Sequence, residues 1–243
     1  MYRPILKKKP LISVIINCFN GEKFLSNCIQ SVLSQSYKNW EIIFFNNNSY
    51  DRSIKILNSF RDKRIKLFNN NKKKPCKLYK ARNLAISKAK GKYITFLDTD
   101  DLWKKNKLEK QIMLIKKNPD INVIYSNYYE IKEKKFLYPK YKKKLPSGFI
   151  TQDLLDDYCI GIVTLFINKK IFSKYKFKES YDILGDFDFM INLSRKFNIL
   201  AIQEPLAFYR IHHSNLSSRR PDLFMQELKN WINKSGLLED KLE

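Results

Sequence analysis

Short apolar runs and helical repeats alternate along the first half of the chain. Runs rich in β-branched residues predict buried strands at 11–16, 40–45, 65–68, 93–97 and 123–125. Between them, apolar side chains recur every three or four residues, which predicts helices over 24–33, 53–60, 81–89 and around 108–115. This alternation is typical of an α/β protein with a mostly parallel central sheet and helices on both faces.

The pattern is weaker in the second half. We expect strands at 162–167 and 199–203, and a helix over roughly 186–197. A terminal helix over 221–243 would place Leu223, Phe224, Leu228, Trp231 and Ile232 on one broad face. Gly91 follows the third helix at a position where a glycine commonly ends one.

Polar clusters follow three of the predicted strands, at 17–21, 46–51 and 98–101. In a parallel sheet the carboxyl ends of neighbouring strands lie side by side, and ligands bind in the crevice beyond them. The sequence therefore predicts one site with hydrogen-bonding groups from two loops and carboxylates from a third.

Three of the four residues at 98–101 are aspartates. Left alone, such carboxylates repel one another and raise each other's pKa values. A cation between Asp98, Asp100 and Asp101 would remove the repulsion, and carboxylate oxygens suit Mg²⁺ or Mn²⁺. A metal held by one or two carboxylates keeps open positions for the phosphate oxygens of a nucleoside diphosphate. Alternatively, Asp100 or Asp101 caps a helix beginning near Leu102, although capping does not explain Asp98.

Composition excludes several classes of protein. The 243 residues are 44% hydrophobic, enough for a packed core, so the chain is not disordered as a whole. No apolar run approaches the roughly 18 residues of a membrane span, and the run at 11–16 is too short for a signal peptide. The four cysteines form no CxxC pair, as expected of reduced thiols. We expect a soluble, unexported protein of the cytoplasm.

The net charge of +23 comes mainly from lysine, because only nine of the 47 basic residues are arginine. A solvated surface is the simplest interpretation. A lysine-rich face on anionic lipid is the second, at the inner face of the cytoplasmic membrane. Arginine clusters and aromatic-studded strand pairs are lacking, so we expect no nucleic-acid partner.

Five separated motifs resemble family 2 glycosyltransferases, inverting enzymes of the GT-A fold. In chain order they are SVIINCFN at 13–20, LSQSY at 33–37, EII at 41–43 with NSYD at 48–51, ARNLA at 81–85 and KGKYITFLDTDDLW at 90–103. The resemblance implies a single GT-A-like domain over 1–220, followed by the terminal helix at 221–243. Within that domain, 11–125 would bind the nucleotide-sugar and 126–220 the acceptor.

The resemblance also assigns residues to the donor. Asp98 and Asp100 match the DxD motif, whose carboxylates bind Mn²⁺ or Mg²⁺ and, through it, the nucleotide-sugar diphosphate. Phe19 takes the place of an aromatic near the base, and Asn20 follows it in the same loop. The further donor contacts would be Asn46, where most members have a base-binding Asp, and Arg82, which would approach the base or diphosphate.

Two later motifs carry the remaining assignments. GDFD at 185–188 matches the acidic catalytic motif and makes Asp186 the general base, with Asp188 as the weaker candidate. YRIHHSNLS at 209–217 matches a late segment whose histidine, here His212, lies near the metal and diphosphate. Each of these residues also has a non-functional alternative: Asp186 could be a surface or helix-capping carboxylate, His212 a structural residue, Arg82 an exposed helix residue and Phe19 a core residue.

The implied reaction transfers a sugar from a nucleoside diphosphate, with UDP-sugar as first choice, to an acceptor hydroxyl. The metal would stabilise the negative charge that develops on the leaving diphosphate, and a carboxylate would accept the proton of the attacking hydroxyl. A single base on the face opposite the leaving group predicts inversion. The acceptor would be a glycan or lipid-linked glycan of a bacterial surface polysaccharide or lipopolysaccharide. We expect the terminal helix to pack against the domain or against a second subunit; contact with the membrane surface is the alternative.

Three departures from the family pattern are Asn17 for Pro, Asn46 for Asp and Gly185 for Glu. They leave open a second hypothesis, a degenerate nucleotide-sugar-binding or scaffold protein of the same fold. A nucleotidyltransferase is disfavoured, since 17–21 holds a single glycine where a glycine-rich phosphate loop would be expected. A lysine-driven nucleic-acid binder would show steep salt dependence.

Overall fold

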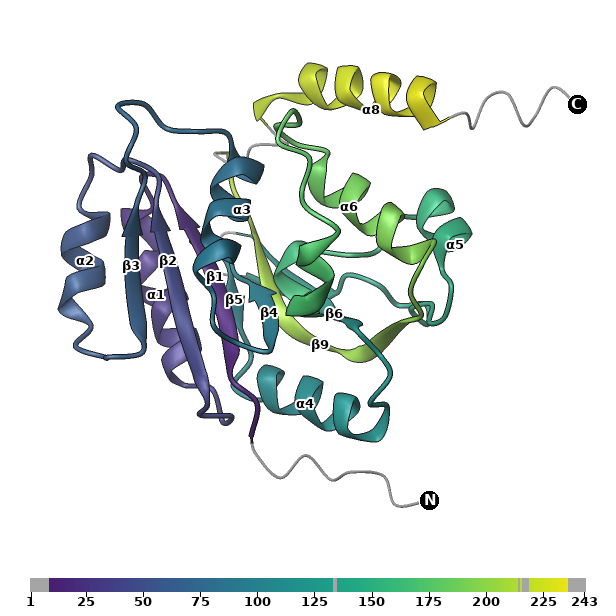
Figure 1. The fold of residues 1–243 in the computed structure, drawn as a ribbon, viewed down its shortest axis with the longest axis horizontal. Coiled ribbons are helices and arrows are strands. Elements are labelled where there is room, and N and C mark those ends of the chain that lie inside the picture. Colours follow the sequence, from purple (N-terminus) through teal and green to yellow (C-terminus); the bar gives the residue numbers. More distant parts are fainter. Residues whose placement is uncertain (1–8, 133–134, 214, 216–218, 236–243) are drawn as a thin grey trace, which may run out of the picture.

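The computed structural model describes residues 9–132, 135–213, 215 and 219–235. One nine-stranded sheet runs through it, in the order β3-β2-β1-β4-β8-β6-β9-β5, with β7 paired to β6. Figure 1 shows β3, β2 and β1 side by side at one end of this sheet. Residues 236–243 of the predicted terminal helix, and Ser214, Leu216 and Ser217 of the late motif, lie outside the described residues.

Helices and strands alternate over the first half as the hydrophobic pattern predicts. The strands are β1 (Ile12–Cys18), β2 (Trp40–Asn46), β3 (Ile65–Asn69), β4 (Tyr93–Phe96), β5 (Leu102–Trp103), β6 (Val123–Lys132), β7 (Lys135–Pro139), β8 (Phe166–Asn168) and β9 (Ile199–Ile211). The helices are α1 (Glu22–Leu33), α2 (Ser53–Ser59), α3 (Leu78–Lys88), α4 (Lys107–Lys117), α5 (Thr151–Asp156), α6 (Gly185–Ser194) and α8 (Pro221–Ser235), with 3₁₀ turns η1 (Ile162–Thr164) and η2 (Lys169–Ser173).

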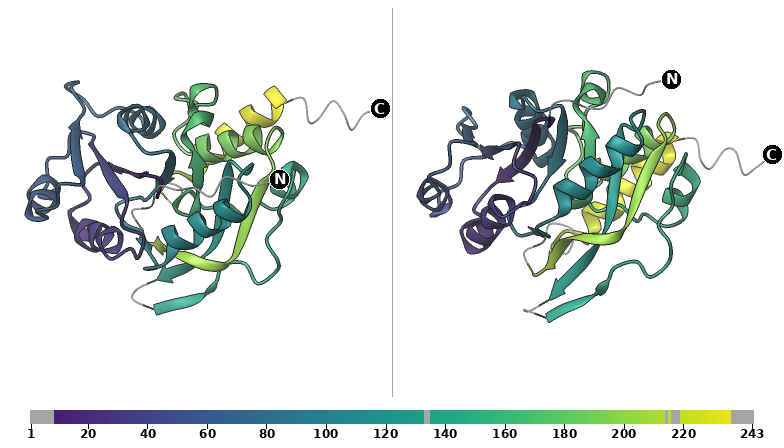
Figure 2. Two further views of the ribbon diagram at one scale, coloured as in Figure 1. Left: turned by 60° about the horizontal axis from the view of Figure 1, so that its bottom comes forward. Right: turned by 90° about the horizontal axis from the view of Figure 1, so that it is seen from below.

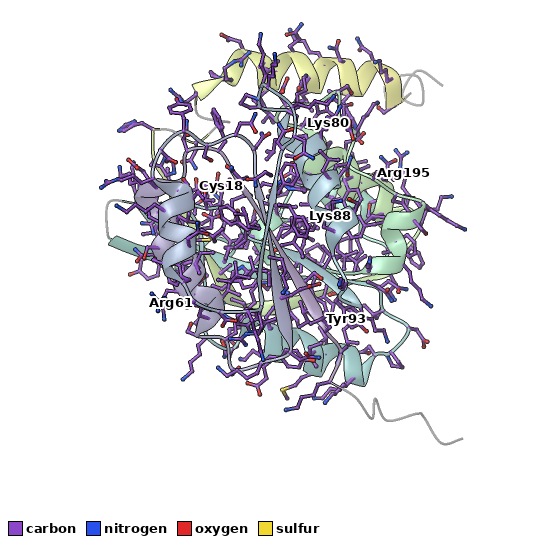
Figure 3. All side chains as sticks on the ribbon, turned by 60° about the vertical axis from the view of Figure 1, so that its left-hand side comes forward. Cys18, Arg61, Lys80, Lys88, Tyr93 and Arg195 are labelled. Atoms are coloured by element: carbon purple, nitrogen blue, oxygen red, sulfur yellow. The ribbon has the colours of Figure 1, made fainter. Side chains whose placement is uncertain are left out.

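The prediction of a mostly parallel α/β sheet is confirmed. Strands β3, β2, β1 and β4 are parallel neighbours, and β6 and β9 form a long parallel pair. Strand β8 joins the two sets by pairing antiparallel with both β4 and β6. The carboxyl ends of β2, β1 and β4 consequently share one edge of the sheet; Figure 3 shows Cys18, at the end of β1, far from Tyr93, at the start of β4.

Helices cover both faces of the sheet (Figure 2), and an apolar layer lies on each face. Side chains alternate along β1, so Val14 and Ile16 join one layer while Ile15 joins the other. The layer of Val14 contains apolar residues of α1, α2 and α4, and the layer of Ile15 contains those of α3, α5, α6 and α8. This double coverage explains why β1 and β2 are nearly continuous apolar runs.

The predicted strand at 162–167 is largely wrong. Residues Ile162–Thr164 form the 3₁₀ turn η1, and the strand covers only Phe166–Asn168. Side chains replace strand neighbours as partners of the carbonyls: the Trp103 indole N–H donates to Val163 O at 3.0 Å and the Thr95 hydroxyl to Leu165 O at 2.6 Å. An apolar run in the sequence predicts that a segment is buried, but it does not predict which side-chain donors will bind its backbone carbonyls.

Gly91 also has another role than the predicted one. The residue after helix α3, Ala89, is extended, and Gly91 is not among the described residues with positive φ. A Cβ at Gly91 would instead lie 2.5 Å from Ser13 N, on β1. The glycine is needed for close approach of two backbone segments rather than to end the helix.

Lys107 makes the stability of this fold pH-dependent. Its ammonium is fully buried and donates to Thr95 Oγ1 and Gln111 Oε1, both neutral, at 3.0 Å. Burial holds the pKa of Lys107 well below its usual range. The unfolded chain then binds the proton more tightly than the folded one, so stability is lost as pH falls below the unfolded pKa of about 10.4.

We therefore expect Lys107 to contribute a free energy of unfolding that rises with pH, by up to about 1.4 kcal/mol per pH unit. The Lys107→Met variant should lack this contribution. Urea unfolding of both proteins between about pH 6 and about pH 9 measures the difference. Parallel pH dependences of the two proteins would contradict the assignment to Lys107.

Candidate active site

The loops after β1 and β2 are joined by hydrogen bonds. Asn47 N donates to Cys18 O at 2.8 Å, and Asn20 N donates to Ser49 Oγ at 3.1 Å. The Asn20 side chain accepts from Tyr50 N at 3.0 Å, and its φ of 54° is one that asparagine tolerates better than most residues. Asn20 therefore shapes this double loop through its own backbone and side chain.

The acidic loop after β4 lies against the same structure. Gly21, at the end of the first loop, is so close to Thr99 that a Cβ there would come within 3.0 Å of the threonine side chain. The three polar clusters thus meet at one edge of the sheet, as the parallel order of β2, β1 and β4 requires.

Arg82 places a buried positive charge beside Asp98. The Arg82 side chain is only 2% exposed, and its Nη2 donates to Asp98 Oδ1 at 3.1 Å. The aromatic rings of Tyr79, Phe96 and Phe177 surround the guanidinium, with centroids 5.3–5.6 Å from its central carbon. Arg82 is therefore not an exposed residue of helix α3, and its aromatic enclosure directs the charge toward the acidic loop.

Asp100 and His212 form the second pair. The His212 Nε2 lies 2.9 Å from Asp100 Oδ2, although 112 residues separate them. Burial and the charge of Asp98 raise the pKa of Asp100, and the hydrogen bond with His212 opposes that effect. The His212 backbone N–H donates to Asn215 Oδ1, and the imidazole packs on the Phe24 ring at 5.1 Å. His212 is thus fixed at the site.

Asp101 is structural, and the alternative that Asp100 or Asp101 caps a helix beginning near Leu102 is wrong. The residue is 1% exposed, and its Oδ1 accepts from Arg210 N at 2.8 Å. No helix begins near Leu102, which lies in strand β5; helix α4 starts only at Lys107. Burial, followed by the charges of Asp100 and Asp98, raises the pKa of Asp101 well above its usual range. Asp101 attaches the end of β9 to the acidic loop, two residues before His212.

Asp98, Asp100 and His212 carry the oxygen and nitrogen donors that a divalent cation binds, and in this structure they are paired with other protein groups. Among the described residues, no group of three or more His, Cys, Asp or Glu side chains is arranged to hold a metal ion. A carboxylate oxygen and an imidazole nitrogen are both donors that a cation such as Mn²⁺ accepts. His212 Nε2 and Asp100 Oδ2 converge at 2.9 Å, with Asp98 nearby in the same loop, so the chemistry of these residues fits such a cation.

Asp186 lies in the first turn of helix α6 and faces helix α3. Its Oδ1 accepts from Phe187 N at 3.0 Å and lies 3.2 Å from the Tyr79 hydroxyl. Burial raises the pKa of Asp186, while the Arg82 charge opposes the rise. Asp186 is therefore not an exposed surface carboxylate, and a carboxylate with a raised pKa is suited to accepting a proton.

Asp188 and Gly185 complete the picture of this motif. Asp188 points to another partner, because its Oδ1 accepts from the Trp231 indole N–H at 3.0 Å. A Cβ at Gly185 would lie 2.5 Å from the Tyr79 ring. The departure from Glu at this position thus has a steric cause: Tyr79 occupies the space that a side chain would need.

The predicted base contacts differ from one another. Asn46 is 8% exposed; its Oδ1 accepts from Ser49 N at 2.9 Å and its Nδ2 donates to Asn69 Oδ1 at 3.0 Å. Its amide is thus used at both ends to hold the loop. Phe19 is 49% exposed and meets the Tyr50 ring edge-on at 6.0 Å, so it is not a core residue. The donor-binding roles of both stay predictions.

Comparison with known proteins places this geometry in context. The family model described as Glycosyl transferase family 2 matches residues 13–198, more than half of the chain. The chain is 32% identical over 235 residues to the Escherichia coli UDP-Glc:alpha-D-GlcNAc-diphosphoundecaprenol beta-1,3-glucosyltransferase WfgD, covering 96% of this chain and 88% of WfgD. It is 28% identical to the putative teichuronic acid biosynthesis glycosyltransferase TuaG of Bacillus subtilis, covering 87% and 83%.

Solved structures share the fold. The S. aureus TarS 1-349 complex with UDP-GlcNAc aligns with a TM-score of 0.71 at 17% identity, over 84% of this chain and 59% of that chain. The Pyrobaculum calidifontis mannosyltransferase PcManGT, in complex with GDP-Man and Mn2+, aligns with a TM-score of 0.64 at 12% identity, over 90% and 62%. This chain therefore spans about three fifths of the length of those solved chains.

The Arg82–Asp98 pair gives a stability test that needs no substrate. The Asp98→Asn variant should lose about 1–3 kcal/mol of unfolding free energy, because it leaves the buried guanidinium without its counter-charge. In an Arg82→Met background, the same substitution should cost at least about 1 kcal/mol less. Urea unfolding of the four proteins gives the coupling energy. Additive losses would show that the two side chains do not interact.

Proposed function

This chain belongs to glycosyl transferase family 2, and from that premise we propose that it moves a sugar from a UDP-sugar to an acceptor hydroxyl with inversion, assisted by a divalent metal. The observation that carries the proposal is the meeting of Arg82, Asp98, Asp100, Asp186 and His212 around the carboxyl end of β4. These residues come from four separate segments and provide both a cation site and a base.

Asp98, Asp100 and His212 would hold Mn²⁺ or Mg²⁺. The chemistry of these donors and their convergence at the end of β4 support this assignment, as does the presence of Mn2+ together with GDP-Man in the PcManGT complex. When bound, such a metal stabilises the negative charge of the leaving diphosphate as a Lewis acid. Arg82 adds a buried positive charge on the same side, directed by its ion pair with Asp98.

Asp186 would take the proton of the attacking hydroxyl. Burial raises its pKa, which makes it a stronger base than an exposed aspartate, and Arg82 keeps the carboxylate form accessible by lowering that pKa again. The Phe187 N–H and the Tyr79 hydroxyl fix the orientation of one carboxylate oxygen. One base, acting opposite the leaving group, gives inversion at the anomeric carbon.

The relatives guide the choice of substrates. TarS is described in complex with UDP and with UDP-GlcNAc, and WfgD is named for UDP-Glc and a diphosphoundecaprenol-linked acceptor. We therefore favour a UDP-sugar whose base stacks near Phe19, and a glycan or lipid-linked acceptor. A bacterial surface polysaccharide or lipopolysaccharide is the matching product, in view of the teichuronic acid biosynthesis for which TuaG is named.

Helix α8 supports a peripheral membrane contact in the cytoplasm better than a dimer. Trp231 is buried in the core layer of α6, and Leu228 and Ile232 pack against it, so this face is already covered within one chain. Phe224 and Met225 are 36% and 50% exposed, and the net charge of +23 would favour an anionic bilayer. In the described part of the chain, no helix is long and apolar enough to cross a membrane.

A screen of nucleotide-sugars tests donor and metal together. We expect a UDP-sugar to release UDP in the presence of Mn²⁺, and we expect EDTA and the Asp98→Ala variant each to lower that rate by at least about 100-fold. Equal rates in Asp98→Ala and the parent would remove the metal argument. Metal-dependent UDP binding without turnover on any donor and acceptor would favour the degenerate binding protein instead.

The Asp186→Asn variant tests the base. Its kcat should fall by about 10²–10⁴, the usual contribution of general base catalysis, while UDP binding is unchanged. In the parent, kcat should decline as acid protonates Asp186, at a pH above the roughly 3.9 of a free aspartate, and this acidic limb should disappear in the variant. NMR of the product's anomeric carbon checks inversion. An undiminished kcat in Asp186→Asn would transfer the role to another group.

A further inference from the structure

We propose that Glu227, on the C-terminal helix α8, is a positioning residue that fixes Asp186 for catalysis. The inference rests on the proposed role of Asp186 as the base. Glu227 lies 41 positions after Asp186 in the chain and outside the segment that the family model matches, which ends at residue 198. It is 7% exposed, although it is an acidic residue on a surface helix.

The Glu227 carboxylate accepts three backbone N–H groups from one short turn. Its Oε1 accepts from Asp182 N at 2.6 Å, and its Oε2 accepts from Ile183 N at 3.0 Å and Leu184 N at 2.9 Å. Charge-assisted bonds of this kind are among the stronger hydrogen bonds in proteins. Helix α8 thereby holds the turn that leads directly into Asp186.

The residue before helix α6, Leu184, makes no side-chain capping hydrogen bond. Its apolar side chain has no acceptor for the N–H groups of the turn. On the other side of the turn, the Tyr79 hydroxyl bonds to Ile183 O at 2.6 Å and also lies 3.2 Å from Asp186 Oδ1. Glu227 from α8 and Tyr79 from α3 therefore hold the same turn, Glu227 through its N–H groups and Tyr79 through a carbonyl.

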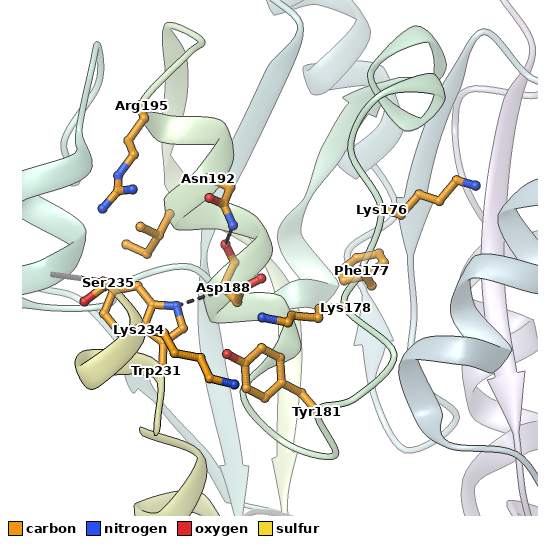
Figure 4. Close-up of a pocket in the computed structure, with 11 residues that line it drawn as sticks. Lys176, Phe177, Lys178, Tyr181, Asp188, Asn192, Arg195, Trp231, Lys234 and Ser235 are labelled. Atoms are coloured by element: carbon orange, nitrogen blue, oxygen red, sulfur yellow. Dashed lines mark hydrogen bonds between the residues drawn. The ribbon is translucent and has the colours of Figure 1, made fainter. Parts of the chain in front are cut away.

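Trp231 adds a second attachment one helical turn after Glu227. Its indole N–H donates to Asp188 Oδ1, and its ring packs edge-on against Phe187 at 4.9 Å. Figure 4 shows the Trp231–Asp188 bond beside a cavity of about 530 Å³ between α6 and α8. The two residues that flank Asp186 in α6, Phe187 and Gly185, are thus fixed by Trp231 and Tyr79.

In this arrangement, donor binding and proton removal depend on different elements of the fold. The donor site is built by the ends of β1, β2 and β4, whereas the hydrogen bonds of the Glu227 carboxylate go to the turn before α6. The position of the base therefore depends on α8 through three hydrogen bonds. Loss of Glu227 should reduce the chemical step and spare donor binding, a separation that general destabilisation of the fold would not produce.

The test compares Glu227→Gln with Asp222→Asn, an exposed acidic residue on the same helix. Both substitutions remove one negative charge from α8. We expect kcat of Glu227→Gln to fall at least about tenfold, since misplacement by about an ångström can cost 100-fold. The donor KM, and the Kd of UDP with Mn²⁺ from calorimetry, should stay within about twofold of the parent. Asp222→Asn should match the parent in all three.

An unchanged kcat in Glu227→Gln, or a loss of UDP affinity in proportion to kcat, would overturn the inference. If Glu227→Gln does not fold, Glu227→Asp provides the same test, because it keeps the negative charge and shortens the reach of the carboxylate to the N–H groups of Asp182, Ile183 and Leu184. Asp186→Asn is assayed in parallel. An inactive Asp186→Asn beside a fully active Glu227→Gln refutes only the role of Glu227, whereas an active Asp186→Asn refutes the proposed base and this inference with it.

Discussion

Crowding of carboxylates at the carboxyl end of β4 is the constraint on which the rest of the site depends. Asp98, Asp100 and Asp101 lie within four residues, and burial together with mutual repulsion raises the pKa values of the latter two. Each has a compensating partner from elsewhere: the guanidinium of Arg82 for Asp98, the imidazole of His212 for Asp100, and a backbone N–H of β9 for Asp101. Helix α3 and the end of β9 are therefore attached to one acidic loop.

The strand order of the second half brings the partners of Asp100 and Asp101 to the acidic loop. Strand β9 is thirteen residues long and runs parallel to β6 over almost its whole length, which carries its end to the acidic loop. There β5, only two residues long, pairs with it directly after Asp101. A sheet made only of the parallel strands β3, β2, β1 and β4 would have the carboxylates but neither the histidine nor the attachment for it.

The sequence predicts the first half well because its information is local. Alternation of apolar runs with 3.6-residue repeats predicts β1 to β4 and helices α1 to α4, although not the two-residue strand β5. The position of polar residues after three of these strands predicts the meeting of the loops. The failures lie where long-range donors or sterics decide: Trp103 and Thr95 satisfy carbonyls at 163 and 165 and prevent a strand, and Gly91 is required by the backbone of β1. Glu227 and Tyr79 escape prediction for the same reason. Each resembles an ordinary helix residue until the fold brings it to the turn before Asp186.

That turn also explains why a glycine can stand where the family often has Glu. A side chain at 185 and the ring of Tyr79 cannot share the same space, so the two positions are physically linked. Tyr79 uses the space to bind Ile183 O and to approach Asp186, while Glu227 binds the N–H groups of the same turn. Asp188, which could compete for the role of base by its position in the motif, is instead engaged by Trp231. A glycine at 185 is thus compatible with an ordered Asp186, because residues from α3 and α8 hold the turn that leads into it.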